Sequence, residues 1–346
     1  MSHLVPGFWI AVSRHSGRVD IRLAMSRIGG GDKLVGATKA ELREAGFSPR
    51  LAQAACSTSS VESKAPWCVF GDEAYPAVLE DLQFPPPVLW WHGNLERLKA
   101  PALAIVGARR CTQTGKDTAF ALAQETVRAS AVVVSGAARG IDTAAHLGAD
   151  GHTIAVLGSP VGEGRSWTAA QVQDQLLDAG GLIVSEVAPG TPVRPGFFPR
   201  RNRIIAALGL GCVVVEANRR SGALITARMA NDLGREVAAV PGRMQQACTA
   251  GCLDLIADGA RCLRTVGEVV ELLGCSAPHL RESESPLQAL ERVLKSPASL
   301  EELVTASGLS PLEATRLLGM WEINGRVRRQ GGGRWRLNVS GGGSSS

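Results

Sequence analysis

The sequence lacks any long apolar run. No stretch approaches the roughly 20 consecutive apolar residues that a membrane-spanning helix needs. The first segment, Met1 to Arg22, has no basic stretch followed by an apolar one, which is the pattern of a secretory signal. We therefore expect a soluble, cytoplasmic protein that makes no membrane contact.

Closely spaced cysteine pairs are also missing. The chain has eight cysteines but no C-x-x-C motif, and several lie in apolar runs such as Gly211–Val214, where cysteines usually behave as small buried hydrophobic residues. Cys248 and Cys252 are four residues apart, but no second Cys or His pair follows at zinc-site spacing. We expect no metal and no cofactor.

Lysine is scarce among the basic residues. The chain has 6 Lys and 31 Arg against 32 acidic residues, for a formal charge of +5. The planar guanidinium of Arg binds phosphate through two hydrogen bonds at once and stacks on flat rings, so a phosphate ligand is one explanation of this bias. Genomic base composition is the other, and the count alone leaves both open.

Alternating apolar runs and helical patterns predict the fold class. At about 100–200 residues per domain, 346 residues indicate two or three domains. Residues 1–65 have a helical pattern, with a capped helix starting at Thr38 and a linker-like end at Ser57–Ser63; a proline-rich connector, Phe84–Trp91, follows. Short buried strands then alternate with helices, which predicts a doubly wound α/β core over 70–275. The expected strands are 102–106, 131–135, 153–157, 181–185, 211–216 and 236–240.

The C-terminal part has the pattern of a winged helix. A polar linker is expected at 276–286, and helices at 287–294, 300–306 and 311–323 precede two short strands around a glycine turn. This domain would span 287–338, and 339–346 would form a disordered tail. Five arginines and no acid occur between Arg326 and Arg336. Backbone phosphates and a partner protein are both open as their ligand.

The first expected strand leads into a turn with two arginines. The run Val106-Gly107-Ala108-Arg109-Arg110 is neither G-x-G-x-x-G nor a P-loop, because Arg110 stands where a P-loop needs glycine. No G-x-S-x-G motif occurs either, which disfavours a serine esterase. At the carboxyl end of a strand, backbone N–H groups and two guanidinium groups suit a phosphate.

The second expected strand leads into small residues, Ser135 to Gly140, that let a ligand approach the backbone, and the following helix N-terminus favours an anion. Asp142 and His146 lie one turn apart on the same helical face. For this pair we favour a structural hydrogen bond over a metal or acid–base site, because no third ligand is near.

The region after the fourth strand combines arginines with aromatic rings. Arg194, Arg200, Arg201 and Arg203 cluster beside Phe197 and Phe198, and no acid occurs between Glu186 and Glu216. Arginine for phosphate and a ring for a base face is the combination that holds single strands. The alternative is a pair of core phenylalanines with a solvated arginine face. After the fifth strand, Ser221 and Thr226 are placed to cap a helix.

These runs together resemble the DNA-processing protein A family (DprA, also called Smf). The resemblance rests on Ile105–Arg109, Ser135–His146, Phe198–Ala206, Ser221–Ala227 and Ala239–Gly242, in this order, after Tyr75-Pro76 and Gly93-Asn94. It implies an extended Rossmann-like core that binds single-stranded DNA without sequence preference and delivers it to the RecA recombinase in natural transformation. It also implies a homodimer, no catalytic reaction, a small N-terminal helical domain of the SAM or helix-hairpin-helix kind, and an optional C-terminal winged helix.

By this likeness and the motifs above, we expect no catalytic or metal-binding residue and a basic DNA-binding pocket. Its expected residues are Gly107, Arg109, Arg110, Ser135, Gly136, Arg139, Gly140, Phe198, Arg200, Arg201, Asn202, Arg203, Ser221 and Gly222.

The chain departs from the family pattern in places. Thr112 replaces a usual Ser and keeps its hydroxyl, and Thr114 replaces an aromatic residue. The family's Tyr-Pro-x-x-Asn segment is missing where Gly162–Thr168 stands, so Arg165 or Trp167 is the candidate substitute, and the Asn expected shortly after Gly251 is absent. Two other functions stay open: an enzyme that cleaves or carries a small nucleotide, and a transcription factor led by the winged helix.

Overall fold

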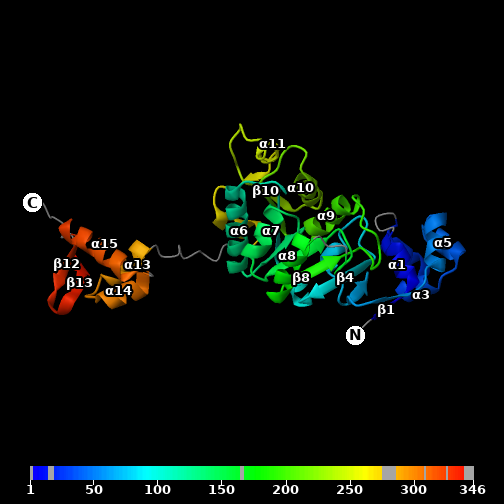
Figure 1. Cartoon of the computed structure of the whole chain (residues 1–346), viewed down its shortest axis with the longest axis horizontal. Helices are drawn as coiled ribbons and strands as arrows, with labels where there is room; N and C mark the ends of the chain where they lie inside the picture. The colour runs from blue at the N-terminus through cyan, green and yellow to red at the C-terminus, as the bar shows by residue number, and fades with distance from the viewer. Residues whose placement is uncertain are drawn as a thin grey trace, which may run out of the picture. The chain divides into compact units, whose positions relative to one another are not determined.

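The structure is a computed structural model that describes residues 3–14, 19–163, 167–274, 286–307, 309–324 and 326–338 (Figure 1). The chain divides into two compact units, Met1–Cys275 and Ser276–Ser346. Within the described segments, no helix is both long and apolar enough to cross a membrane.

A nine-stranded sheet forms the centre of the first unit, in the order β11-β10-β9-β5-β6-β7-β8-β4-β3. All neighbours from β11 to β8 are parallel, whereas β4 and β3 run antiparallel. All six strands expected from the sequence are present, within two residues at each end. The strands are β3 (Trp67–Val69), β4 (Val88–Gly93), β5 (Ala102–Val106), β6 (Val132–Ser135), β7 (Thr153–Leu157), β8 (Leu182–Ser185), β9 (Gly211–Val214), β10 (Glu236–Ala239) and β11 (Arg261–Cys262).

The antiparallel edge corrects one expectation. The proline-rich segment Phe84–Trp91 was expected to be a connector, but its second half begins β4, where Trp90 lies opposite Ser185 of β8. The prolines end at Pro87, so the strand keeps the N–H groups that its two neighbours need. Trp90 is fully buried, and β4 therefore belongs to the core.

Helices cover both faces of this sheet, which confirms the doubly wound fold (Figure 1). One face, with Leu103 and Ile105, packs against α6, α7 and α12, and the other face, with Ala104 and Val134, packs against α9 and α10. The helices of this part are α6 (Gln113–Arg128), α7 (Ile141–Gly148), α8 (Trp167–Asp178), α9 (Phe197–Leu208), α10 (Gly222–Asp232), α11 (Ala250–Ala257) and α12 (Val269–Leu272), with short 3-10 turns at Ala77–Leu79, Leu95–Lys99 and Val266–Glu268.

The N-terminal segment is helical as expected, with one correction. The sequence predicts a linker at Ser57–Ser63, but β2 (Val61–Ser63) pairs antiparallel with β1 (His3–Val5). The capping box at Thr38 is confirmed, because its side chain accepts from Glu41 N and the Glu41 side chain accepts from Thr38 N. The helices are α1 (Gly7–Arg14), α2 (Ile21–Ile28), α3 (Gly31–Gly36), α4 (Lys39–Glu44) and α5 (Pro49–Ser57).

These N-terminal helices share a hydrophobic core with the sheet. Phe8 and Leu51 belong to the same buried cluster as Trp90 and Leu157. An independent domain over 1–65 stays a prediction.

The second unit has the expected three helices and two strands. They are α13 (Pro286–Val293), α14 (Leu300–Ser307), α15 (Pro311–Ile323), β12 (Val327–Gln330) and β13 (Arg334–Leu337), joined by a 3-10 turn at Gly331–Gly333. Leu303, Leu318 and Trp335 form its core. The expected tail 339–346, and the expected linker apart from Pro286, lie outside the described residues.

The turn after β6 is tied to the sheet by Asp142 and His146. Ala137 in this turn has φ 51°, a left-handed conformation that costs a non-glycine residue roughly 1–2 kcal/mol. Asp142 Oδ2 accepts from the N–H groups of Gly136 (3.2 Å) and Ala138 (3.3 Å), and His146 Nε2 accepts from Ala137 N (3.3 Å). These bonds hold the turn in place, which confirms the structural role expected for the pair.

The tautomer of His146 follows from its partners. Thr153 Oγ1 donates to Val133 O (2.9 Å), so it accepts from His146 Nδ1 at 2.7 Å, and the ring is neutral with its proton on Nδ1. Burial, together with the charge of Arg201, lowers the pKa of His146 to about 3. Within the described residues, no group of three or more His, Cys, Asp or Glu side chains is placed to hold a metal.

The buried neutral histidine makes stability depend on pH. Because the unfolded chain binds a proton on this ring near pH 6.5 and the folded chain only near pH 3, acid favours unfolding below about pH 6.5. We expect the free energy of unfolding to fall about 1.4 kcal/mol further in the wild type than in His146→Gln between pH 7.5 and 5.5. Urea titrations of both proteins measure this difference, and parallel losses in the two would contradict it.

Candidate nucleic-acid interface

The strand order of the sheet defines where a ligand fits. The chain runs outward from β5 to β8 and then returns to β9 on the opposite side of β5. In doubly wound sheets, the crevice outside the carboxyl ends of the strands at this reversal is where ligands bind. The loops that leave β5 and β9 therefore frame the candidate site.

A cavity of about 650 Å³ opens at this point. It brings together eight of the fourteen predicted residues. The lining residues are Val106, Gly107, Ala108, Arg109, Arg110, Ala138, Asp142, Pro195, Phe198, Pro199, Arg201, Asn202, Ile205, Asn218, Arg220, Ser221, Gly222, Ala223, Ile225 and Thr226.

Two exposed arginines lie on the loop between β5 and α6. Arg109 and Arg110 are exposed, and the Arg109 guanidinium lies 5.9 Å from the centre of the Phe198 ring. Ala108 N donates to Glu216 O (2.7 Å), and Thr112 N donates to Glu216 Oε2 (2.9 Å), so both ends of the loop are attached to the same residue. The loop thus presents two positive charges from a fixed backbone.

The two phenylalanines at the start of α9 differ in their surroundings. Phe197 is buried, and the Arg200 guanidinium lies 5.0 Å from its ring centre. Phe198 is half-buried and lines the cavity. One ring therefore serves the core, as the alternative explanation held, and the other faces the site.

The loop after β9 supplies a basic residue that the sequence analysis omitted from the site. Arg220 is exposed and lines the cavity, and its N–H donates to Asn218 Oδ1 (3.0 Å), which fixes the turn. The signal was present as an arginine pair directly after a buried strand. Gly222 adds open backbone, because a Cβ atom there would meet nothing within 4 Å.

The capping expectation for this helix is half right. Ser221 caps α10, since its side chain accepts from Ala223 N (3.3 Å). Thr226 is a buried residue within α10, so a capping role for it was wrong.

Arg201 lines the cavity as a buried cation. Its Nη1 donates to Val156 O, and a Cβ atom at Gly136 would come within 2.7 Å of its guanidinium, which explains the glycine there. Burial lowers the pKa of Arg201 to about 10, while Asp142 opposes this shift, so it is charged at neutral pH. Burial raises the pKa of the Asp142 carboxyl, and Arg201 with the backbone N–H groups counteracts that shift.

Arg200 and Arg203 are bound to an acid. The Glu186 side chain is 1 % exposed and lies 2.9 Å from Arg200 Nε and 2.5 Å from Arg203 Nη2. No acid follows Glu186 in the sequence before Glu216, but Glu186 itself neutralises much of the arginine cluster. Neither arginine lines the cavity.

Four further predicted residues lie behind or beside the lining. Ser135 is fully buried and donates to Ile105 O (2.6 Å), while Gly140 has φ 91° and packs on Ala108 O. Gly136 contacts Arg201, and Arg139 is exposed outside the lining. DNA contacts by these four, and by Arg200 and Arg203, stay predictions.

The segment that replaces Tyr-Pro-x-x-Asn is only partly described. Arg165 lies outside the described residues, and α8 begins at Trp167. Cys252, next to the position of the absent Asn, is fully buried. A replacement contact from Arg165 or Trp167 stays a prediction.

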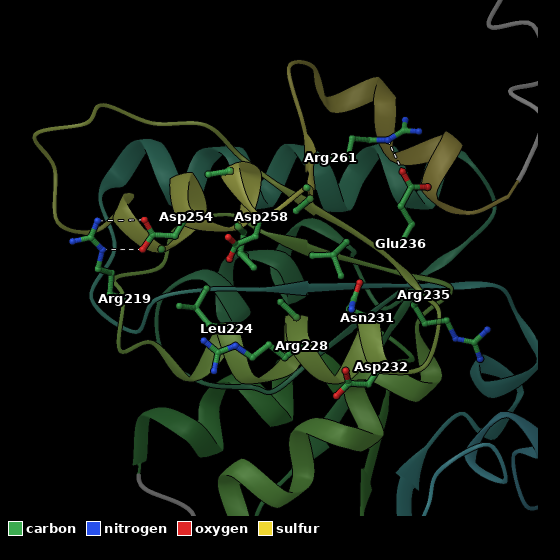
Figure 2. Close-up of a pocket in the computed structure, with 17 residues that line it drawn as sticks. Arg219, Leu224, Arg228, Asn231, Asp232, Arg235, Glu236, Asp254, Asp258 and Arg261 are labelled. Atoms are coloured by element: carbon green, nitrogen blue, oxygen red, sulfur yellow. Dashed lines mark hydrogen bonds and ion pairs between the residues drawn. The ribbon is translucent and has the colours of Figure 1, made fainter.

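A second cavity, of about 760 Å³, lies between α10, α11 and the β10–β11 edge (Figure 2). Its charges balance, because its lining combines four arginines with four acids. Arg219 Nε pairs with Asp254 Oδ2 at 2.8 Å, and Arg261 Nε pairs with Glu236 Oε1 at 2.6 Å (Figure 2). In the first cavity, four arginines face one acid, Asp142. The first cavity is therefore the better site for a polyanion.

Comparisons with known proteins agree with this architecture. The family model for DNA recombination-mediator protein A matches residues 67–274, and the model for the DprA winged helix domain matches 269–333. DNA processing protein DprA of Streptococcus pneumoniae is 40% identical over 202 residues, which cover 58% of this chain and 71% of the relative.

Two solved structures are similar. The X-ray structure of DprA from Streptococcus pneumoniae matches with a TM-score of 0.66 and 30% identity, covering 78% of this chain and 98% of that one. A structure of DNA processing protein A from Helicobacter pylori, described for its single-stranded DNA binding mode, matches with a TM-score of 0.55 and 27% identity, covering 61% of this chain and 96% of that one. The chain therefore belongs to the DNA recombination-mediator protein A (DprA) family, whose members process DNA in recombination.

Proposed function

We propose that this chain binds single-stranded DNA without sequence preference in the cavity between the β5 and β9 loops, and that it helps to load RecA onto the strand. The observation that carries the proposal is the charge of this cavity, with four arginines, a half-buried ring and one acid. The described binding mode of the Helicobacter pylori relative supports it. Natural transformation is the proposed setting.

The side chains of the cavity match the chemistry of a single strand. Arg109, Arg110 and Arg220 are exposed and suit backbone phosphates, which every sequence presents alike. Phe198 offers a ring to a base, and each base has a face that stacks. A duplex hides those faces, so this combination favours an unpaired strand.

We propose a binding role rather than a reaction. The one carboxylate in the lining, Asp142, accepts two backbone N–H groups and lies near Arg201, so it already has a structural task. The proposed protein partners are RecA and a second copy of the chain. A RecA loading assay on strands coated with single-strand binding protein tests the first, with faster loading as the expected result.

The exposed arginines should control affinity and salt dependence. We expect Arg109→Ala and Arg220→Ala each to weaken binding of single-stranded oligonucleotides about tenfold or more, equally for all sequences, because a charged hydrogen bond to phosphate is lost. The slope of log affinity against log salt should fall by about 0.7 for each phosphate contact removed. Fluorescence anisotropy over a salt series measures both quantities.

Arg128→Ala is the matched control, since Arg128 is an exposed arginine near the far end of α6. It should bind as the wild type does. Wild-type affinity that ignores salt, or that is higher for duplex than for single strand, would contradict the proposal.

Arg203 should behave differently from Arg109. Because Arg203→Ala removes one of two cations from the buried Glu186 carboxylate while Arg200 stays in place, we expect a loss of stability of about 1.5–3 kcal/mol, the range for a hydrogen bond to a charged group. Urea unfolding at neutral pH measures this loss. A variant that keeps full stability and loses only DNA affinity would show that Arg203 contacts the strand instead.

A further inference from the structure

We infer that Glu216 is a positioning residue for DNA binding: it holds the arginine-bearing loop 107–112 in its binding conformation through Thr112. This inference rests on the function proposed above. Glu216 lies two residues after the end of β9, and the residue is 6 % exposed. It does not line the cavity itself.

Glu216 is bonded to both ends of the loop. At the first end, its backbone oxygen accepts from Ala108 N at 2.7 Å. At the second end, its carboxylate accepts from Thr112 N (2.9 Å, Oε2) and from Thr112 Oγ1 (2.5 Å, Oε1). Arg109 and Arg110 lie between these two attachments and are exposed.

Thr112 extends the same connection into α6. Its hydroxyl donates to Glu216 and accepts from Gly115 N (2.9 Å), which caps the helix. A Cβ atom at Gly115 would lie 2.6 Å from Glu216 Cδ, so the carboxylate fills the space that the missing side chain leaves. One carboxylate thereby joins β9, the arginine loop and the start of α6.

A carboxylate suits this contact better than an amide does. Two donors of Thr112 point at the two oxygens of Glu216, and an amide offers one oxygen and one NH₂ group. In Glu216→Gln, one Thr112 donor would meet another donor or lose its partner. The amide can still accept from Thr112 N, but the bonds to a charged acceptor are lost, so the second attachment of the loop would be weaker and the positions of the two arginines less fixed.

Whether removing the Glu216 charge weakens or strengthens DNA binding distinguishes a positioning role from a purely electrostatic one. A negative charge near an anion site repels the anion, so removing it would strengthen DNA binding if Glu216 acted only through its field. A positioning role predicts the opposite result. A purely structural role would lower the folded fraction but leave the salt slope of the folded protein unchanged.

The test is anisotropy with a fluorescein-labelled oligothymidylate over a salt series, together with thermal unfolding of each variant. We expect Glu216→Gln to bind about tenfold more weakly, with a salt slope lower by about 0.7 or more. Asp117→Asn is the matched control, because it removes one negative charge from an exposed position on α6. It should not weaken binding.

A pair of Thr112 variants gives a second test that does not depend on the folding of Glu216→Gln. Thr112→Val removes the hydroxyl at constant size and should weaken DNA binding about tenfold. Thr112→Ser keeps the hydroxyl and should bind DNA with nearly the wild-type affinity. Equal binding by the Val and Ser variants, or wild-type or tighter binding by folded Glu216→Gln, would overturn the inference.

The outcomes also separate this inference from the proposed function. If the wild type binds the oligonucleotide and Arg109→Ala weakens it, while the Glu216 and Thr112 variants bind normally, only the positioning role fails. If the wild type does not bind, the proposed function fails and the positioning role fails with it.

Discussion

The reversal of strand order between β5 and β9 is the constraint on which the site depends. It separates the two loops that leave these neighbouring strands, one toward α6 and the other toward α10, and opens a cavity between them. Every exposed arginine of the lining lies on one of these loops. The parallel register of β5 and β9 therefore sets the distance between the backbones of the two loops that carry these arginines.

Buried acids determine which arginines are available. Glu186 and Glu216 each follow a buried strand, and each is less than a tenth exposed. Glu186 binds Arg200 and Arg203 directly, whereas Glu216 binds the backbone beneath Arg109 and Arg110 and leaves their guanidinium groups exposed. A buried glutamate therefore neutralises Arg200 and Arg203 in one place, and in the other it holds the backbone of a loop whose arginines stay exposed.

The sequence was sufficient for the main strands and for the edge of the sheet where the site lies. Strands such as Ala102–Val106 are continuous apolar runs, and the carboxyl-end rule places their following loops together. Strand β4, which lies second from the edge of the sheet, was missed because three prolines precede it, and β11 was missed because it has only two residues.

The sequence did not predict which arginines are paired with a buried acid and which are exposed. Arg200 and Arg203 lie 14 and 17 residues from Glu186, and their pairing depends on how α9 packs against β5, β6 and β7. The separate fates of Phe197 and Phe198 also depend on that packing, because neighbouring residues of a helix face different surroundings.

Hydrogen–deuterium exchange with and without a single-stranded oligonucleotide locates the bound strand on the chain. We expect bound DNA to slow exchange of the backbone N–H groups in 107–112 and 218–222 and to leave exchange at the β10–β11 edge unchanged. Slower exchange confined to the β10–β11 edge, or no change in either loop under conditions of full binding, would contradict this expectation.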